Sequence, residues 1–312
     1  MRADKALLLV LCLTIIFGAS ACRHKHRYRP QPVAFGNLAY GPNTDNGANL
    51  LDLYLPVGKG PYPLVVCIHG GGWESGDKAF FPFRELVRNG FAVASINYRL
   101  SAQAAFPAQI IDCKLAIGWL RLHAADYDLD PDAIGIWGMS AGGHLAALAG
   151  LTGDMPAPPW ASPDRQVSNH VAAVCDWCGP SDLVSISPQS GGNLAVNDLL
   201  TRLLGTTPAS DPALTREASP VFYSQRELPP FLIMHGLKDP IVPSQQSREL
   251  NDHLKSIGAD STLILLKGAN HGFYSPENEA KVIDFFERTL KAKRTKAGTC
   301  PGAVPCMRTI AS

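Results

Sequence analysis

The 312-residue sequence has almost no net charge, because 28 lysines and arginines stand against 27 aspartates and glutamates. A protein that holds nucleic acid by its phosphates presents an excess of basic side chains, so the composition gives no electrostatic reason to expect such a partner. After its first 21 residues, the sequence also lacks an apolar run long enough to cross a bilayer. Internal repeats are absent as well. These absences leave a globular protein of ordinary composition, in which 46% of the residues are hydrophobic.

Residues 1–21 have the features of an export signal peptide. Arg2 and Lys5 supply a positive start, residues 6–17 form an apolar core, and residues 18–21 are small. The apolar core is too short to span a bilayer comfortably as a retained helix. We therefore predict an exported protein, and these residues do not enter the fold.

Cys22 directly follows the predicted signal. The run Ala19-Ser-Ala-Cys22 is similar to the lipobox of bacterial lipoproteins, in which the cysteine is lipidated, although an aliphatic residue is usual at position 19. Ordinary cleavage after Ala21 is the alternative. The first reading predicts a lipoprotein anchored to a membrane of the bacterial cell envelope through Cys22, and the second a periplasmic or secreted protein. Residues 22–32 then form a basic tether.

The remaining cysteines form no recognisable metal motif. Cys175-Asp-Trp-Cys178 has C-x-x-C spacing, but it follows a predicted strand, and no second pair exists to complete a zinc site. Cys67 lies in an apolar strand and is expected to be a buried thiol. Cys300 and Cys306 flank a short loop and can close a small disulfide after export, although the connectivity cannot be read from sequence. The sequence therefore predicts no metal site.

The stretch around Ser140 predicts a strand, a sharp turn and a helix. Ile134–Trp137 is a short apolar run, Gly138-Met-Ser-Ala-Gly142 follows it, and residues 144–151 have helical character. A serine held in a strained turn brings the residues two before and two after it into close contact, so both must lack a bulky side chain. The two glycines meet that requirement. A bare match also describes an ordinary Gly-Ser turn, so the neighbouring motifs decide between the two interpretations.

His69-Gly-Gly-Gly-Trp73 directly follows the apolar run Leu64–Ile68. Three glycines after a buried strand leave backbone N–H groups open to a ligand, and this loop resembles the HGGG oxyanion loop of lipases and esterases. The predicted oxyanion donors are the N–H groups of Gly71, Gly72 and Ala141. A phosphate-binding loop is the alternative, but it requires a G-K-[ST] ending, which is missing.

An acid and a histidine follow the last two predicted strands. Phe231–His235 is one apolar strand and is followed by Asp239; Thr262–Leu266 is the next and is followed by His271. Together with Ser140 they give the chain order Ser, Asp, His that is typical of nucleophile-elbow enzymes. The spacing predicts that all three side chains lie at the ends of strands.

Asp182 is a rival for the acid, because it too lies after a strand and before His271. Asp239 is favoured, since its strand immediately precedes the one that ends near His271. We therefore predict that Ser140 is the nucleophile, His271 the base and Asp239 the acid of a catalytic triad.

Strands alternate with helices along most of the chain, which predicts an α/β fold with a mostly parallel sheet covered on both faces. Ligands of such sheets bind beyond the carboxyl ends of the strands, where the motifs lie. The alternation in Leu51–Leu55 predicts an antiparallel edge strand with one solvated face. Residues 33–292 are expected to form one catalytic domain, with a small cap insertion at about 177–230 in which residues 197–204 form one helix. Residues 293–312 are expected to form a flexible tail.

Several motifs together resemble those of a known family: His69-Gly-Gly-Gly-Trp73, Asn97-Tyr-Arg-Leu100, Phe106-Pro-Ala-Gln109 with Asp112, residues 138–144, Trp177 to Asp182, and Asn270-His-Gly-Phe273. The chain resembles the α/β-hydrolase superfamily, and within it the hormone-sensitive-lipase-like esterases, most closely their feruloyl and acetylxylan esterase branch. The resemblance covers about residues 33–292. It implies an α/β-hydrolase fold, the triad of Ser140, Asp239 and His271, and no cofactor. Met139 departs from the hormone-sensitive-lipase pattern, in which an Asp is common.

The resemblance implies a serine carboxylesterase that hydrolyses short-chain acyl esters through an acyl-serine intermediate. Acetyl or feruloyl esters of plant polysaccharide are the family-based extension. A serine peptidase of the prolyl-oligopeptidase type uses the same triad order, but such enzymes usually carry an N-terminal propeller, for which we expect no room here. A formamidase, or a non-catalytic surface binding protein, would also be compatible with this fold. The acyl and alcohol specificity depends on how the cap folds, which a sequence pattern does not give.

Overall fold

The computed structural model describes residues 34–80, 83–162, 166–225 and 227–291. The predicted export signal, the tether with Cys22, and the C-terminal tail with Cys300 and Cys306 lie outside these ranges. Within the ranges, no helix combines the length and the apolar character needed to cross a bilayer.

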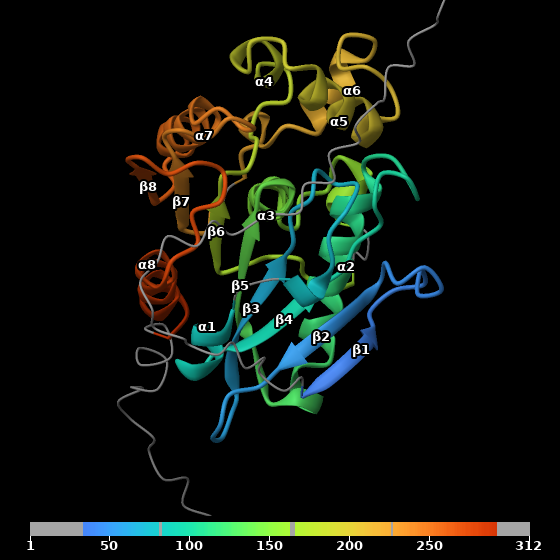
Figure 1. Ribbon diagram of the computed structural model, residues 1–312. Coiled ribbons are helices and arrows are strands. Elements are labelled where there is room, and N and C mark those ends of the chain that lie inside the picture. The colour runs from blue at the N-terminus through green and yellow to red at the C-terminus, as the bar shows by residue number, and fades with distance from the viewer. Residues whose placement is uncertain (1–33, 81–82, 163–165, 226, 292–312) are drawn as a thin grey trace, which may run out of the picture. The chain divides into compact units, whose positions relative to one another are not determined.

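An eight-stranded sheet forms the centre of the domain (Figure 1). In spatial order its strands are β1 (Phe35–Ala39), β2 (Leu50–Tyr54), β4 (Ala92–Ile96), β3 (Tyr62–Ile68), β5 (Leu129–Met139), β6 (Ala173–Trp177), β7 (Phe231–Gly236) and β8 (Ser261–Leu266). β2 pairs antiparallel with both β1 and β4, whereas every pair from β4 to β8 is parallel. The predicted mostly parallel sheet is confirmed, and parallel strands place all their carboxyl ends at one edge.

Helices cover both faces of the sheet (Figure 1). Outside the segment between β6 and β7, they are α1 (Arg84–Arg88), α2 (Ala108–Leu122), α3 (Ala141–Thr152), α7 (Gln245–Ser256) and α8 (Pro276–Phe286). Side chains of α2, α3 and α7 join one apolar core, and those of α1 and α8 join the core on the other face. Every residue of α3 is buried, so this helix, which follows the predicted nucleophile, is fully enclosed by the rest of the domain.

The prediction for residues 51–55 as an edge strand with a solvated face is wrong. β2 lies between β1 and β4, and Leu51, Asp52 and Leu53 are all buried. The polar position of the alternating pattern is neutralised within the protein, because Asp52 forms an ion pair with Lys78 at 2.8 Å. The edge strand on this side of the sheet is β1, whose residues are mostly exposed. In β2 the alternating pattern therefore reflects a buried ion pair and not a face in contact with water.

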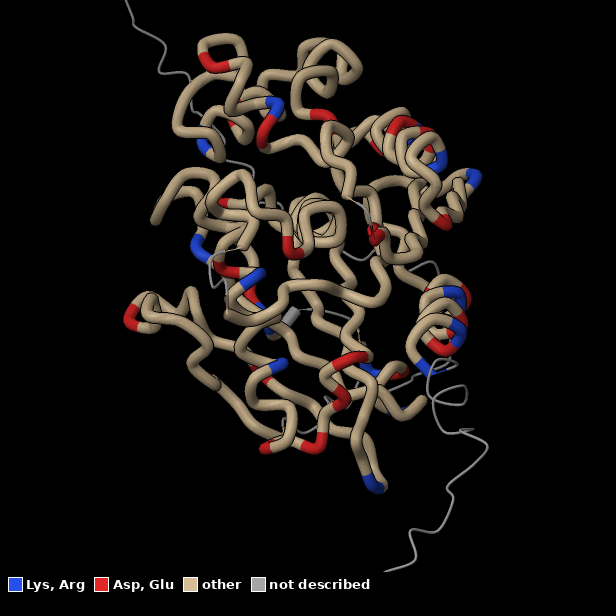
Figure 2. The backbone as a smooth tube through the Cα atoms, turned by 180° about the vertical axis from the view of Figure 1, so that it is seen from behind, with Lys and Arg blue, Asp and Glu red and all other residues tan. Residues whose placement is uncertain are grey.

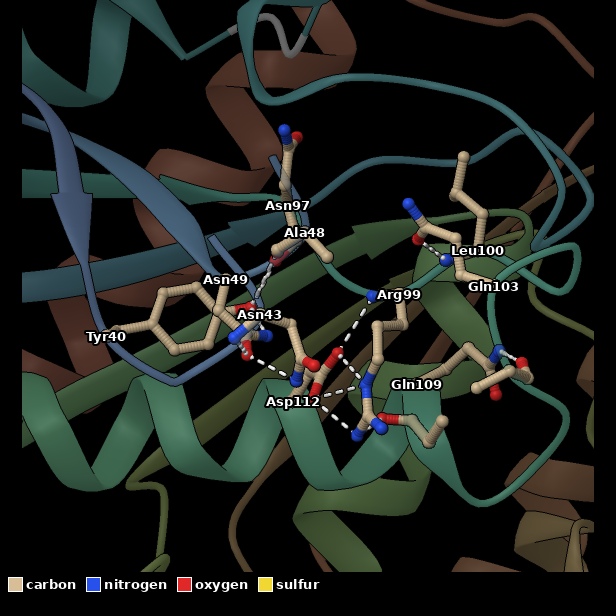
Figure 3. Close-up of polar contacts among 12 residues, drawn as sticks. Tyr40, Asn43, Ala48, Asn49, Asn97, Arg99, Leu100, Gln103, Gln109 and Asp112 are labelled. Carbon is tan, nitrogen blue, oxygen red and sulfur yellow. Dashed lines mark hydrogen bonds and ion pairs between the residues drawn. The ribbon is translucent and has the colours of Figure 1, made fainter. Parts of the chain in front are cut away.

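The motif residues Arg99 and Asp112 form a bidentate ion pair (Figure 3). The Arg99 side chain donates to both carboxylate oxygens of Asp112, at 2.8 to 3.1 Å, and the Arg99 backbone N–H donates at 2.8 Å. Asp112 is fully buried in α2, so the pair ties the segment after β4 to that helix. Bidentate pairs of this kind fix geometry as well as charge. These motif residues therefore support the sheet edge and take no direct part in the predicted chemistry.

Acidic and basic residues are interspersed along the described part of the chain (Figure 2). α8 and the helical turn after it carry the ion pairs Lys281–Glu277, Arg288–Asp284 and Lys291–Glu287, each four residues apart. Exposed pairs of this kind contribute little to stability. Their solvent-facing positions leave the apolar side of α8 to pack on the sheet.

The segment between β6 and β7 forms a helical cap. It contains α4 (Ile186–Gln189), α5 (Leu194–Leu204) and α6 (Pro212–Glu217), of which the sequence predicted only the second, as residues 197–204. α5 begins three residues earlier than predicted, because the Asn193 side chain accepts the N–H of Ala195 and caps the helix. Trp177 is the last residue of β6 and is buried in the core, so it precedes the cap.

Candidate active site

Ser140 lies at a sharp turn between β5 and α3. Its backbone has φ +57° and ψ −121°, a conformation that L-residues rarely adopt. A Cβ on Gly138 would lie 2.0 Å from the Gly142 carbonyl oxygen, and one on Gly142 would lie 2.2 Å from the Ile68 carbonyl oxygen. Both contacts are impossible for any other residue. The steric reason for glycine on either side of the predicted nucleophile therefore holds in the structure.

The three residues of the predicted triad lie in one continuous set of hydrogen bonds. His271 Nε2 is 2.9 Å from Ser140 Oγ, and His271 Nδ1 is 2.6 Å from Asp239 Oδ2. The Asp239 carboxylate is fully buried, whereas the His271 side chain is 21% exposed. Because Nδ1 faces a carboxylate, it carries the ring proton and leaves Nε2 free to accept the serine proton. The arrangement is that of a serine activated by a histidine.

The Asp239 carboxylate is held in its ionised form. Its Oδ1 accepts the backbone N–H groups of Ile241 and Val242, at 2.8 and 3.0 Å. Burial by itself raises the pKa of the Asp239 carboxyl, but hydrogen bonds from His235, His271 and the Ile241 N–H outweigh it and hold that pKa well below its usual value. Asp239 therefore stays negatively charged at any pH at which the protein would work.

The rival acid Asp182 has a different role. Its Oδ1 accepts the backbone N–H groups of Val184 and Ser185, at 2.9 and 3.3 Å, and so fixes the turn that leads into α4. Asp239, and not Asp182, hydrogen-bonds His271. Between the two acids considered from sequence, the structure brings only Asp239 to the histidine.

The glycine-rich loop after β3 passes directly beside the turn at Ser140. A Cβ on Gly70 would lie 2.9 Å from the Met139 carbonyl oxygen. Gly72 and Ala141 line the cavity next to Ser140. Gly71 forms the turn before them, since its carbonyl accepts the N–H groups of Glu74 and Ser75. Two of the predicted oxyanion donors therefore lie at the cavity wall, and the third lies in the adjoining turn.

A buried histidine that sequence reasoning missed links this loop to the cap. Trp73 Nε1 donates to His144 Nδ1 at 3.2 Å, and His144 Nε2 donates to the Ala218 carbonyl at 2.7 Å. Burial lowers the pKa of His144 to about 4, so the ring is neutral and keeps both contacts. Position 144 ends the motif quoted from the sequence, but neither partner of its side chain is near it in the chain.

Helix α5 contacts the same loop. Leu199 Cδ2 lies 2.7 Å from the position that a Cβ on Gly72 would occupy. Arg202, one turn further along α5, forms an ion pair with Glu74 at 2.6 Å. The cap therefore packs on the loop through both an apolar and a charged contact.

The cavity beside Ser140 is small and apolar, with a volume of about 30 Å³. A cavity that holds a single water has a volume of about 10–15 Å³, so this cavity takes a group of a few heavy atoms. Its walls are Gly72, Trp73, Ala141, Pro180, Ile186, Val196, Leu199, Leu200, Ile241 and Val242. A larger, open pocket near residues 57–63 lies at the amino end of β3, at the sheet edge opposite Ser140.

Of the aromatic residues in the motifs quoted from the sequence, Trp73 lines this cavity, whereas Trp177 and Phe273 do not. Trp177 stacks edge-on against Trp137 at 5.0 Å and packs against Phe273 at 4.8 Å. Both Trp177 and Phe273 belong to the apolar core beneath the site. Core packing, and not contact with a ligand, is therefore the role of these two.

Cys178, Asp239 and His271 place ligand atoms within 4.8 Å of one another, the one such group found in the described ranges. Asp239 and His271 are already hydrogen-bonded to each other. Burial raises the pKa of the Cys178 thiol well above its usual value, and a metal ligand has to be a thiolate. We therefore assign no metal to these residues. Cys175 and Cys178 are both free thiols.

Comparison with known proteins agrees with the geometry. The BD-FAE family model matches residues 51–254. Esterase LipQ of Mycobacterium tuberculosis is 36% identical over 255 residues, which cover 79% of this chain and 59% of LipQ. The chain thus spans about three fifths of the length of this relative.

Two solved structures are similar over most of the domain. A truncated carbohydrate esterase from gut microbiota is 32% identical with a TM-score of 0.72, covering 82% of this chain and 96% of that chain. A thermophilic esterase from the Planctomycetes species Thermogutta terrifontis, described as propionate bound, is 27% identical with a TM-score of 0.62. The match covers 86% of this chain and 96% of that chain. Both are esterases, and both carry the same architecture around the sheet.

Proposed function

The chain belongs to the BD-FAE family and has the α/β-hydrolase fold, and from that premise we propose that it is a serine carboxylesterase acting on esters of short acyl groups. The observation that carries this proposal is the placement of His271 between Ser140 and Asp239, at 2.9 and 2.6 Å, beside a small apolar cavity. A serine nucleophile, a base and an orienting acid are the parts that acyl transfer needs.

The proposed reaction begins when Ser140 Oγ attacks the ester carbonyl carbon and His271 Nε2 takes the serine proton. Asp239 stabilises the imidazolium that forms. Backbone N–H groups of Gly71, Gly72 and Ala141 would donate hydrogen bonds to the negatively charged carbonyl oxygen, and each would lower the activation free energy by about 3–4 kcal/mol. The C–O bond to the alcohol then breaks, and His271 returns the proton to the departing oxygen. Water, activated by the same histidine, releases the acid from the acyl-serine.

The cavity volume favours acetyl and propionyl groups. A volume of about 30 Å³ holds the methyl or ethyl of such an acid, whereas a feruloyl group is several times larger. The similar structures are described as a carbohydrate esterase and as an esterase with propionate bound, which supports the same range. Of the acetyl and feruloyl groups considered from sequence, we therefore propose acetyl esters, with a carbohydrate as the alcohol.

Replacing Leu199 by Ala is expected to lengthen the acyl chain that the enzyme accepts. The wild-type protein should hydrolyse p-nitrophenyl acetate and propionate and lose about tenfold or more in kcat/KM from propionate to hexanoate, since one misfitting methylene costs at least that much. Leu199→Ala removes the branched end of a cavity-wall side chain, so hexanoate should recover about tenfold relative to acetate. Initial rates with p-nitrophenyl esters from acetate to palmitate measure the chain-length preference of the wild type and of the variant.

The matched control is Leu194→Ala on the same helix. Leu194 is 78% exposed and lies outside the cavity wall, so its removal should leave the chain-length profile unchanged. A wild-type protein that prefers palmitate to acetate would contradict the short-acyl proposal. Hydrolysis of a prolyl amide substrate without ester hydrolysis would favour a peptidase, and activity on a formamide alone would favour a formamidase.

From the sequence alone, we also propose that the protein is exported and lipidated on Cys22. Bacteria that express the full chain with radioactive palmitate should yield a labelled protein in the membrane fraction, and Cys22→Ala should lose both the label and the membrane association. Cys12→Ala is the matched control, because that cysteine leaves with the signal. The absence of a Cys22-dependent label would overturn the anchor, and a protein without any label would favour the periplasmic or secreted alternative.

A further inference from the structure

A second buried histidine contacts the predicted catalytic acid. His235 belongs to β7 and is 0% exposed, and Asp239 follows four residues later. His235 Nε2 lies 3.1 Å from Asp239 Oδ2 and 2.9 Å from the Val242 carbonyl oxygen. Both neighbours are acceptors only, so Nε2 carries the ring proton and donates to both. The other ring nitrogen is then free to accept.

Helix α7 fixes this form of the ring. Ser247 is a buried residue of α7, and its Oγ lies 2.6 Å from His235 Nδ1. With the proton of the imidazole on Nε2, the serine hydroxyl donates to Nδ1. The contacts therefore run without a break from Ser247 in α7, through His235, to Asp239, and on to His271 and Ser140.

The Asp239 carboxylate is saturated by donors. An ionised carboxylate offers about four lone-pair sites. Oδ1 receives the backbone N–H groups of Ile241 and Val242, and Oδ2 receives the ring N–H groups of His271 and His235. The carboxylate cannot rotate without losing at least one of these bonds.

We propose that His235 is a positioning residue of the proposed esterase. Its ring holds the Asp239 carboxylate in the orientation that His271 requires, and the negative charge on Oδ2 is shared between the two imidazoles. This inference rests on the proposed role of Asp239. Sharing weakens Oδ2 as an acceptor for the His271 proton, because each donor withdraws electron density from the same oxygen. His235 therefore moderates how strongly Asp239 stabilises the imidazolium, in addition to fixing its direction.

Two other titratable groups lie near these residues, and both come from β6 and the turn after it. Burial raises the pKa of the Cys178 thiol well above its usual value, so it stays neutral. Burial raises the pKa of Asp176 to about 6, although the hydrogen bond from Gly179 and the nearby His235 act to lower it. A change in the charge of Asp176 could therefore be mistaken for one of the catalytic histidine in a pH profile. The pH profiles are therefore compared in an Asp176→Asn background as well.

The test compares His235→Phe with His235→Gln. The phenyl ring keeps the bulk and removes all three polar contacts of the His235 ring, with Asp239, Val242 and Ser247, so Oδ2 is left to His271 alone. The acid limb of the kcat/KM profile should then move to higher pH by about half a unit to one unit, and kcat should fall by about tenfold to a hundredfold. The Gln amide has two N–H groups for the two acceptors that Nε2 faces, Asp239 Oδ2 and the Val242 carbonyl. It should restore the wild-type limb and most of the rate.

The matched control is His253→Phe. His253 is a histidine of α7 whose Nε2 donates to the Tyr223 carbonyl at 2.7 Å, so it has a structural contact without Asp239. Its replacement should leave the limb in place, whatever it does to the melting temperature. An unmoved or lowered limb in His235→Phe, or a Gln variant no better than Phe, would overturn the proposal.

A readout independent of ester hydrolysis separates this inference from the proposed function. The short N–H···O bond between His271 Nδ1 and Asp239 Oδ2 should give a downfield proton resonance in the full-length protein. His235→Phe should shift that resonance, and His235→Gln should return it. If the wild-type protein hydrolyses no ester, the proposed function fails, but this shift still decides whether His235 acts on Asp239.

Discussion

Replacing Ser140 by Ala is expected to lower kcat for acetyl esters by on the order of a millionfold, to the residual rate that the oxyanion donors supply alone. The variant has no oxygen to form the acyl-enzyme, while its methyl group fits the space that Ser140 already fills. A fluorophosphonate probe should label the wild-type protein at Ser140 and leave the variant unlabelled, which intact-mass measurement detects directly.

The thermal unfolding of Ser140→Ala is the control for this result. Ser140 has a strained backbone with φ +57°, and alanine experiences the same strain, so the melting temperature should stay close to that of the wild type. Equal esterase activity in the two proteins would refute the nucleophile assignment. A wild-type protein that binds no probe and hydrolyses no ester would favour a non-catalytic binding protein on the same fold.

Replacing Asp239 by Asn is expected to lower kcat by about 10³- to 10⁴-fold. Asp239 Oδ1 faces the fixed backbone N–H groups of Ile241 and Val242, so the asparagine oxygen takes that place and its NH₂ group takes the place of Oδ2. The NH₂ then donates to His271 Nδ1 and forces the ring proton onto Nε2. That tautomer cannot accept the proton of Ser140. Steady-state kinetics with p-nitrophenyl acetate at neutral pH measures the loss.

Asp182→Asn is the matched control, because the described contacts of the Asp182 carboxylate are all with the turn before α4. Its asparagine oxygen can still accept the Val184 N–H, so kcat should change by less than about threefold, as expected for a residue that caps a turn away from the reacting atoms. The reverse ranking of the two variants would reassign the acid of the triad.

The sequence was sufficient for the turn at Ser140 because the steric requirement there is local. A Cβ on Gly138 would lie 2.0 Å from the Gly142 carbonyl oxygen, a contact inside the turn that the pattern itself states. The 2.2 Å contact that requires glycine at 142 is with the Ile68 carbonyl oxygen of β3, so for Gly142 the pattern supplied the residue type and the structure its partner. The Ser, Asp and His order extends this reasoning to strand ends, which parallel strands bring to one edge. The triad geometry followed from those two rules.

The parts that depend on distant partners were not accessible in the same way. The alternation in β2 was correct, but the sequence did not show that Lys78 neutralises Asp52 and that β1 covers the edge. His144 and His235 are buried polar residues, and buried polar groups need partners. The sequence places each of them in an apolar segment, which signals that partners exist. It does not name Trp73 and Ser247, which lie 71 and 12 residues away.

The contact between α5 and the glycine-rich loop has a consequence for how such an enzyme can diversify. One helix supplies both a wall of the acyl cavity, through Leu199, and an ion pair to the loop, through Arg202 and Glu74. Exchanging this segment for that of a paralogue would alter chain-length preference and transition-state stabilisation together. New selectivity in this scaffold is therefore reached more directly by single substitutions inside the cavity wall than by grafting whole caps.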